Sequence, residues 1–149
     1  MFTAIQRFRV EWAHCDPAGI IFNPNYYLWM DAGTHALIQA AGYDLIGNTH
    51  ADPLFRGCPL VASNMDFMHP LYFGDVTALT SRVERFGNTS FVVSHAFRRG
   101  DDPQPVATGK EVRVWGYSDP EEPSKLVAIT VPQEVRDMLS VEKTVDVTV

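Results

Sequence analysis

The sequence predicts an α+β fold in which one long helix packs against an antiparallel sheet of about five strands. Three observations indicate this fold. One alternating segment opens the chain, a single long helical pattern covers residues 24–41, and several alternating segments separated by turn residues follow. With 149 residues the chain suits one domain, which we expect over residues 1–139, followed by a tail at 140–149.

The first element is a strand over residues 2–12, because apolar and polar side chains alternate there. Gln6 is the exception on the apolar side. The apolar side of this strand is formed by Phe2, Ala4, Phe8, Val10 and Trp12.

A tight turn and the long helix come next. In the turn Asp16–Gly19, Asp opens a type I β-turn, Pro presets φ at the second position and Gly closes it. Asn23 can cap the helix, and Pro24 suits its first position because the missing N–H would have no intrahelical partner. Gly42 stands where a terminating glycine is expected. The stripe at helical spacing comprises Tyr26, Trp29, Met30, Gly33, Leu37, Ala40 and Ala41.

The rest of the chain reads as strands joined by turns, with Gly87-Asn88 forming a hairpin turn. Residues 43–57 form a long connection, either a lid that shapes the substrate site or a short helix. The tail is either loose or a late edge strand. Strands are predicted over residues 60–69, 75–86, 89–99 and 105–117, a short sheet extension over 126–130 and a helix over 132–139. On the strand at 105–117 we place Val106, Val112 and Val114 on one face, with Trp115 and Tyr117 on the other.

Asp16 is the leading candidate for chemistry, because it lies just before the start of the long helix. Free N–H groups and the positive end of the helix dipole can polarise a carbonyl. A nearby carboxylate can attack that carbonyl or activate a water. The alternative is that Asp16 only holds its own turn through a side-chain hydrogen bond.

Composition narrows the class of protein. The net charge of −6 argues against general nucleic-acid binding, and no apolar run approaches the length of a membrane span. Cys15 and Cys58 make no disulfide framework, and the N-terminus lacks the apolar core of a signal peptide. His50, His69 and His95 show no metal-ligand spacing. We therefore expect a cytoplasmic protein without a metal site or cofactor.

The run from Glu11 to Tyr26, which contains Cys-Asp-Pro-Ala-Gly-Ile and Pro-Asn-Tyr, resembles the signature of hotdog-fold acyl-CoA thioesterases. It is most similar to the 4-hydroxybenzoyl-CoA thioesterase group, and the later runs Glu111–Val114 and Leu126–Ile129 also look similar. The resemblance implies a central helix wrapped by an antiparallel sheet. It also implies homodimers or homotetramers with active sites at the dimer interface.

The resemblance assigns roles by position. Asp16 matches the catalytic carboxylate, and Asn23 matches the residue whose backbone N–H points at the thioester carbonyl. Asp31, inside an apolar helix, is a candidate for binding substrate; with His35 it also forms a helical pair of the kind that is often structural. Thr89 and Ser90 are candidates to reach the substrate from the partner chain, or are plain hairpin residues.

The segment before Ser90 departs from relatives that carry basic residues there to hold the CoA nucleotide. In this chain those positions are Gly87, Asn88 and Thr89. The nucleotide is then either held elsewhere, with Arg82, Arg85, Arg98 and Arg99 as the candidates, or held more weakly.

The expected function is hydrolysis of an aromatic or a short- to medium-chain acyl-CoA, with Asp16 as nucleophile or general base. Hydrolysis of a carrier-protein thioester and a non-catalytic acyl-binding role are the alternatives. A hotdog dehydratase is a further possibility, but it would need a His facing an acidic residue across the pocket. His14 lies two residues from Asp16, and we expect it to pack or to bond a turn rather than to transfer a proton.

Overall fold

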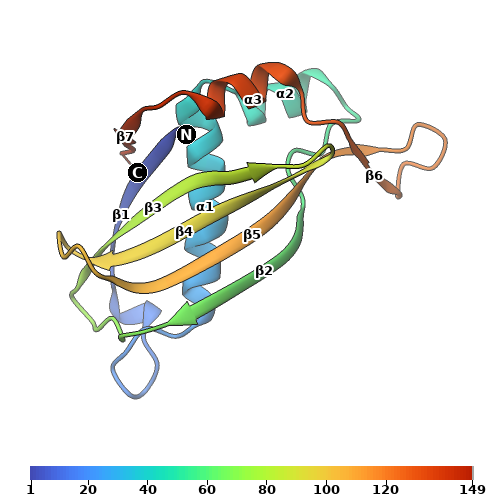
Figure 1. Cartoon of the computed structure of the whole chain (residues 1–149). Coiled ribbons are helices and arrows are strands. Elements are labelled where there is room, and N and C mark those ends of the chain that lie inside the picture. The colour runs from blue at the N-terminus through green and yellow to red at the C-terminus, as the bar shows by residue number, and fades with distance from the viewer. Residues whose placement is uncertain (149) are drawn as a thin grey trace.

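The computed structural model describes residues 1–148 and contains a mostly antiparallel sheet and three α-helices, with one helix crossing the sheet (Figure 1). The elements in chain order are β1 (Thr3–Arg9), the 3₁₀ turn η1 (Trp12–His14), α1 (Pro24–Ala41), α2 (Leu45–Ala51), β2 (Leu60–Phe67), β3 (Val76–Phe86), β4 (Ser90–Arg99), β5 (Pro105–Ser118), β6 (Leu126–Ile129), α3 (Gln133–Ser140) and β7 (Thr144–Asp146).

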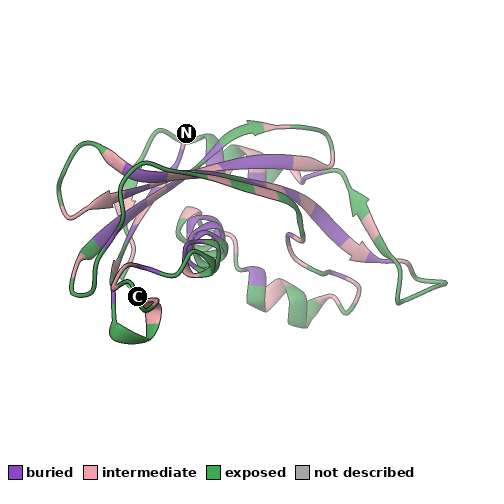
Figure 2. Cartoon of the chain, turned by 90° about the horizontal axis from the view of Figure 1, so that it is seen from below, coloured by how far each residue is buried: buried purple, intermediate pink, exposed green. Residues whose placement is uncertain are grey.

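The sheet has seven strands rather than the five predicted, in the order β2-β5-β4-β3-β1-β7, with β6 paired to the end of β5. The two additional strands are short. β7 pairs with β1 in parallel, so residues 144–146 of the tail form an edge strand, while Val149 lies outside the described residues. α1 runs along one face of the sheet, and Figure 2 shows that helix end-on beneath it. This is the hotdog architecture.

Local sequence explains where α1 begins and ends. Pro24 occupies the first helical position, and Gly42 ends the helix at φ 113°, donating its N–H to the carbonyls of Gln39 and Ile38. The predicted capping role of the Asn23 side chain is wrong: it makes no cap hydrogen bond, and the residue already has helical dihedrals. Asn25 ties this end down instead, because its Nδ2 donates to the carbonyls of His14 at 2.9 Å and Phe22 at 3.1 Å.

Gly33 lets α1 approach the sheet closely. A Cβ at this position would lie 2.8 Å from both Leu79 Cδ2 and Ser81 Oγ on β3. The gap that glycine leaves in the apolar stripe is therefore filled by strand side chains. The stripe itself is mostly as predicted, although Ala40 is exposed and Ile38 is buried in its place.

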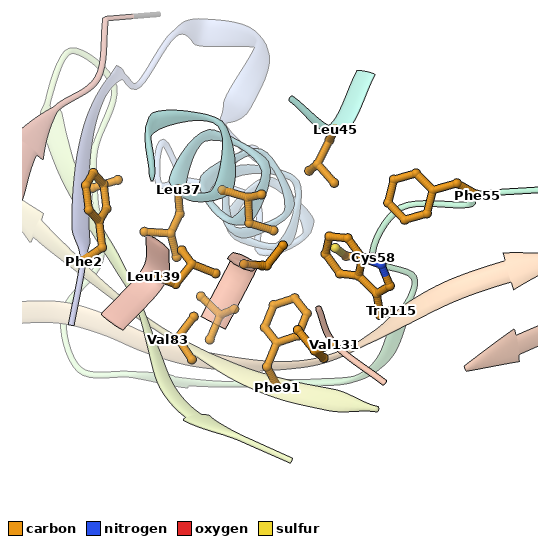
Figure 3. Packing of buried hydrophobic residues seen from close by; sticks show 14 residues of the cluster. Phe2, Leu37, Leu45, Phe55, Cys58, Val83, Phe91, Trp115, Val131 and Leu139 are labelled. Carbon is orange, nitrogen blue, oxygen red and sulfur yellow. The ribbon is translucent and has the colours of Figure 1, made fainter. Parts of the chain in front are cut away.

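Two apolar clusters hold the ends of α1. One surrounds Tyr26, Trp29 and Met30 at the helix start, where Trp29 stacks on Phe8 with the ring centroids 5.0 Å apart. The other gathers around Leu37 near the helix end, where the side chains converge from the sheet and from α3 (Figure 3). Its labelled members are Phe2, Leu37, Leu45, Phe55, Cys58, Val83, Phe91, Trp115, Val131 and Leu139.

Two local predictions are resolved by these elements. The connection at 43–57 contains the short helix α2, whose Asp44 carboxylate accepts the Gly47 N–H at 2.9 Å. Trp12, predicted on the buried side of the first strand, is 72% exposed because the chain leaves the sheet after Arg9 and enters η1.

Candidate active site

The turn that carries Asp16 has the predicted hydrogen bonds. The Gly19 N–H donates to the Asp16 carbonyl at 3.0 Å, and the Ala18 N–H donates to Asp16 Oδ1 at 2.9 Å. Asp16 Oδ2 accepts no hydrogen bond from the described residues. One carboxylate oxygen therefore holds the turn while the other is available, so a structural and a chemical role are compatible.

The start of α1 offers one free amide close to this turn. Cys15 pairs with Ile21 in an antiparallel bridge, and the Phe22 N–H donates to the His14 carbonyl at 2.8 Å, which brings the Asp16 turn back to the helix start. Among residues 22–26, Asn23 alone has a backbone N–H that no described residue accepts, since Pro24 has none. This donor lies at the positive end of the helix dipole.

A cavity of about 330 Å³ opens beside this amide. Its wall is mainly apolar, and Tyr26 forms part of it. Burial raises the pKa of Tyr26 to about 12, only partly offset by a hydrogen bond with the Leu71 backbone, so its hydroxyl stays protonated at neutral pH. The lining residues are Ile20, Ile21, Asn23, Tyr26, Phe67, Met68, His69 and Pro70.

Asp31 lies about two helical turns after Asn23 on α1, and a side chain of the sheet strand β5 holds it in place. Its Oδ1 accepts a hydrogen bond from Arg113 Nη2 at 2.6 Å, and its side chain is 53% exposed. Arg113, in contrast, is buried and also donates to Glu111 through Nη2 at 2.7 Å and through Nε at 3.1 Å. Arg113 and His35 belong to the wall of a cavity of about 300 Å³ on this side of the helix.

Glu111 anchors the inner end of this polar cluster. Its Oε2 accepts from Thr34 Oγ1 at 2.5 Å and lies 3.4 Å from His95 Nε2. Burial alone would raise the pKa of Glu111, but hydrogen bonds from His95, Arg113 and Thr34, together with the charge of Arg113, lower it to about 2. Burial would likewise lower the pKa of Arg113, and its contacts with Glu111 and Asp31 raise it instead.

The alternation of apolar side chains along β5 did not predict that Glu111 and Arg113 are buried against α1. Val112 and Val114 face away from α1, whereas Glu111, Arg113 and Trp115 face it and are buried. The family resemblance of the Glu-Val-Arg-Val run is the one signal in the sequence for these two residues.

Within one chain, the hairpin between β3 and β4, which carries Thr89 and Ser90, lies at the opposite end of the sheet from the start of α1 (Figure 1). Their hairpin is fastened beside α3, where Arg136 Nη2 donates to the carbonyl of Asn88 at 2.8 Å. Asp16 lies at the other end of the 18-residue helix α1, which spans roughly 27 Å. A single chain therefore does not bring these residues to Asp16.

The four arginines proposed for the CoA nucleotide have different surroundings. Arg82 and Arg98 lie on the sheet face away from α1, in a hollow of about 470 Å³ that Lys110 also lines. Arg99 is paired with Asp75 at 3.2 Å, and Arg85 lines a smaller hollow of about 230 Å³. Arg82 and Arg98 are thus the pair that share one hollow.

Other candidate groups are held in structural roles. His14 Nδ1 accepts the Glu11 N–H at 2.9 Å and its ring packs on Trp29, as predicted. Burial raises the pKa of the Cys58 thiol to about 12, which makes it a poor nucleophile. Within residues 1–148, no three His, Cys, Asp or Glu side chains gather in a way that could hold a metal ion, and no helix is long and apolar enough to cross a membrane.

The helix wrapped by a sheet, with a carboxylate and a free amide at the helix start, defines a hotdog-fold thioester hydrolase. The sequence profile of the Thioesterase superfamily matches residues 18–106. The chain is also 32% identical over 135 residues to 4-hydroxybenzoyl-CoA thioesterase of Pseudomonas sp. (strain CBS-3), covering 89% of this chain and 94% of that protein. The chain therefore belongs to the Thioesterase superfamily.

Solved structures agree with this assignment. An Asp-to-Asn variant of 4-hydroxybenzoyl-CoA thioesterase in complex with 4-hydroxybenzoyl-CoA superposes with a TM-score of 0.84 and 30% identity, covering 93% of this chain and 99% of that one. A gentisyl-coenzyme A thioesterase superposes with a TM-score of 0.75 and 28% identity, covering 92% and 99% of the two chains.

Proposed function

We propose that the protein hydrolyses acyl-CoA thioesters whose acyl group is aromatic, of the 4-hydroxybenzoyl kind, or is a short- to medium-length chain. The observation that carries the proposal is that Asp16, with one free carboxylate oxygen, belongs to the turn held against the start of α1, where Asn23 has a free N–H and lines an apolar cavity. The names of the relatives, which act on 4-hydroxybenzoyl- and gentisyl-CoA, favour the aromatic class.

The proposed mechanism uses few groups. The Asn23 N–H and the dipole of α1 bind the thioester oxygen and stabilise its developing negative charge. Asp16 either attacks the carbonyl carbon, expelling the CoA thiolate and leaving a mixed anhydride that water hydrolyses, or takes a proton from the water that attacks. Both routes give the free acid and CoA.

Asp31 is proposed to bind the acyl group. Arg113 occupies its Oδ1, and Oδ2 accepts no hydrogen bond from the described residues, so a half-exposed acceptor remains for a hydroxyl on the acyl group. A substituent of this kind is what separates 4-hydroxybenzoyl from benzoyl thioesters.

The proposed site includes residues from a second copy of the chain. Among the described residues the edge strand β2 has a partner strand on one side only, and it exposes apolar residues, with Val61 62% and Phe67 47% exposed. Such an edge is suited to pairing with another copy in a homodimer or homotetramer. Thr89 and Ser90, which are remote from Asp16 in their own chain, then reach the partner's site, and Arg82 and Arg98 are candidates for the CoA phosphates.

Release of free thiol from a panel of thioesters tests the function. The panel comprises 4-hydroxybenzoyl-, benzoyl-, phenylacetyl- and short- and medium-chain acyl-CoA, with wild type and Asp16→Asn. We expect wild type to hydrolyse an aromatic member and Asp16→Asn to be slower by about a hundredfold or more. Full activity in the variant would exclude Asp16 as the essential carboxylate. If the protein hydrolyses carrier-protein thioesters and no acyl-CoA, its substrate class is carrier-protein thioesters instead.

A further inference from the structure

We propose that Arg113 is a positioning residue for acyl-group recognition, which fixes Asp31 so that one of its carboxylate oxygens remains available to the substrate. The inference rests on the proposed function and adds a residue that does not itself touch the substrate. Four observations support it. The Arg113 guanidinium is fixed by hydrogen bonds, Glu111 is bound to Thr34, Thr34 and Asp31 share a face of α1, and the Asp31 side chain is half exposed.

The guanidinium of Arg113 has almost no freedom to move. Nη2 donates to Asp31 Oδ1 at 2.6 Å and to Glu111 Oε1 at 2.7 Å, Nε donates to Glu111 Oε2 at 3.1 Å, and Nη1 donates to the Cys58 carbonyl at 3.1 Å. Four of its five N–H groups are thus used, and the side chain is 3% exposed. Its orientation toward Asp31 is set by the protein and not by solvent.

Glu111 and Arg113 on β5 each hydrogen-bond to a side chain of α1, at two successive turns of the helix. The two residues are separated by one position on β5 and point to the same face, and Glu111 accepts from Thr34 while Arg113 donates to Asp31. Thr34 and Asp31 are three residues apart on the helix and therefore share a face. The Thr34 contact stabilises the packing of α1 on the sheet, whereas the Arg113 contact holds the Asp31 carboxylate itself.

The arrangement gives Asp31 a defined free acceptor. An unrestrained aspartate at this exposure would sample several rotamers. With Oδ1 bound to Arg113, Oδ2 has a set direction and no hydrogen-bond donor among the described residues; His35 Nδ1 lies 3.6 Å away and donates to the Asp31 backbone carbonyl instead. Because the acceptor is charged but half exposed, we expect a preference of about tenfold for an acyl group that carries a matching hydroxyl.

The test measures the ratio of kcat/KM for 4-hydroxybenzoyl-CoA to that for benzoyl-CoA. We expect a ratio of about ten in wild type, and a ratio near one in Asp31→Ala and in Arg113→Lys, which keeps the charge but loses the planar fork. In the double variant Asp31→Ala/Arg113→Lys, the ratio should equal that of Asp31→Ala alone, because the carboxylate that Arg113 positions has been removed. A merely structural residue would lower both rates equally and leave the ratio unchanged.

Thr34→Val is the matched control, because it removes a buried hydrogen bond to Glu111 but leaves the contact between Arg113 and Asp31. It should lower the unfolding midpoint and keep the wild-type ratio. Arg113→Gln, which retains a planar donor, serves if the lysine variant does not fold. An unchanged ratio in a folded Arg113 variant overturns the inference, as does a wild-type ratio of one. Failure of wild type to hydrolyse either thioester would instead contradict the proposed function.

Discussion

Replacing Glu111 with glutamine should remove a pH-dependent part of the free energy of unfolding. The pKa of Glu111 is about 2 in the folded protein, against an ordinary value of 4.5, which we take for the unfolded chain. Because folding favours the ionised carboxylate, this stabilisation is complete above pH 4.5 and is lost as the pH falls toward 2. The difference between the two values corresponds to about 3 kcal/mol in total, with about 2 kcal/mol of it lost by pH 3.

Urea unfolding of wild type and Glu111→Gln, followed by tryptophan fluorescence at several pH values between 7 and 3, measures this term. We expect the two proteins to differ most above pH 5 and the difference to shrink by about 2 kcal/mol at pH 3. Glu84→Gln is the control, because Glu84 is 41% exposed and pairs with Lys110 at the surface, where ion pairs contribute little. A difference between wild type and Glu111→Gln that stays constant from pH 6 to pH 3 would refute the reasoning.

Three further predictions concern packing, cysteine reactivity and assembly. Gly33→Ala should lower the unfolding free energy by about 1–3 kcal/mol in urea titrations, because its Cβ would meet Leu79 and Ser81 at 2.8 Å, and unchanged stability would show that β3 yields freely. In the folded protein an alkylating reagent should label the partly exposed Cys15 and leave Cys58 unmodified, as mass spectrometry of digested protein can show, with both labelled in urea. Val61→Lys on the β2 edge should shift the mass measured by light scattering toward that of a monomer, whereas Val141→Lys, at a comparably exposed valine just after α3, should not.

Local signals in the sequence predicted the start of the site well. The Asp16 turn and the beginning of α1 depend on proline, glycine and a short polar side chain within a few positions of one another, so each residue specifies its own conformation. The capping assignment shows the limit of this reasoning. Asn23 and Asn25 are both near the helix start, and only the position of the His14 carbonyl, eleven residues away from Asn25, selects which of them is used.

The polar cluster under the middle of α1 could not be derived in this way. Alternating charges on a strand normally indicate a solvent-facing side, and that pattern placed the valines of β5 together on one face. Glu111 and Arg113 face inward because each is satisfied by a partner on α1, 77 and 82 positions away in the sequence. Burial of charged groups is tolerable only when such partners exist, and no local pattern identifies them.

The contacts that hold Asp31 differ from those that hold the Asp16 end of α1. Apolar packing is not directional, so the clusters at the two ends of the helix favour its burial but do not by themselves fix its rotation. At the start of α1, Asn25 ties the helix to the Asp16 turn, whereas Glu111 and Arg113 act at the middle of the helix. Variants of Asn25 should therefore lower turnover of all thioesters, and variants of Arg113 should alter which acyl group is preferred, because attack on the thioester and recognition of the acyl group depend on separate sets of hydrogen bonds.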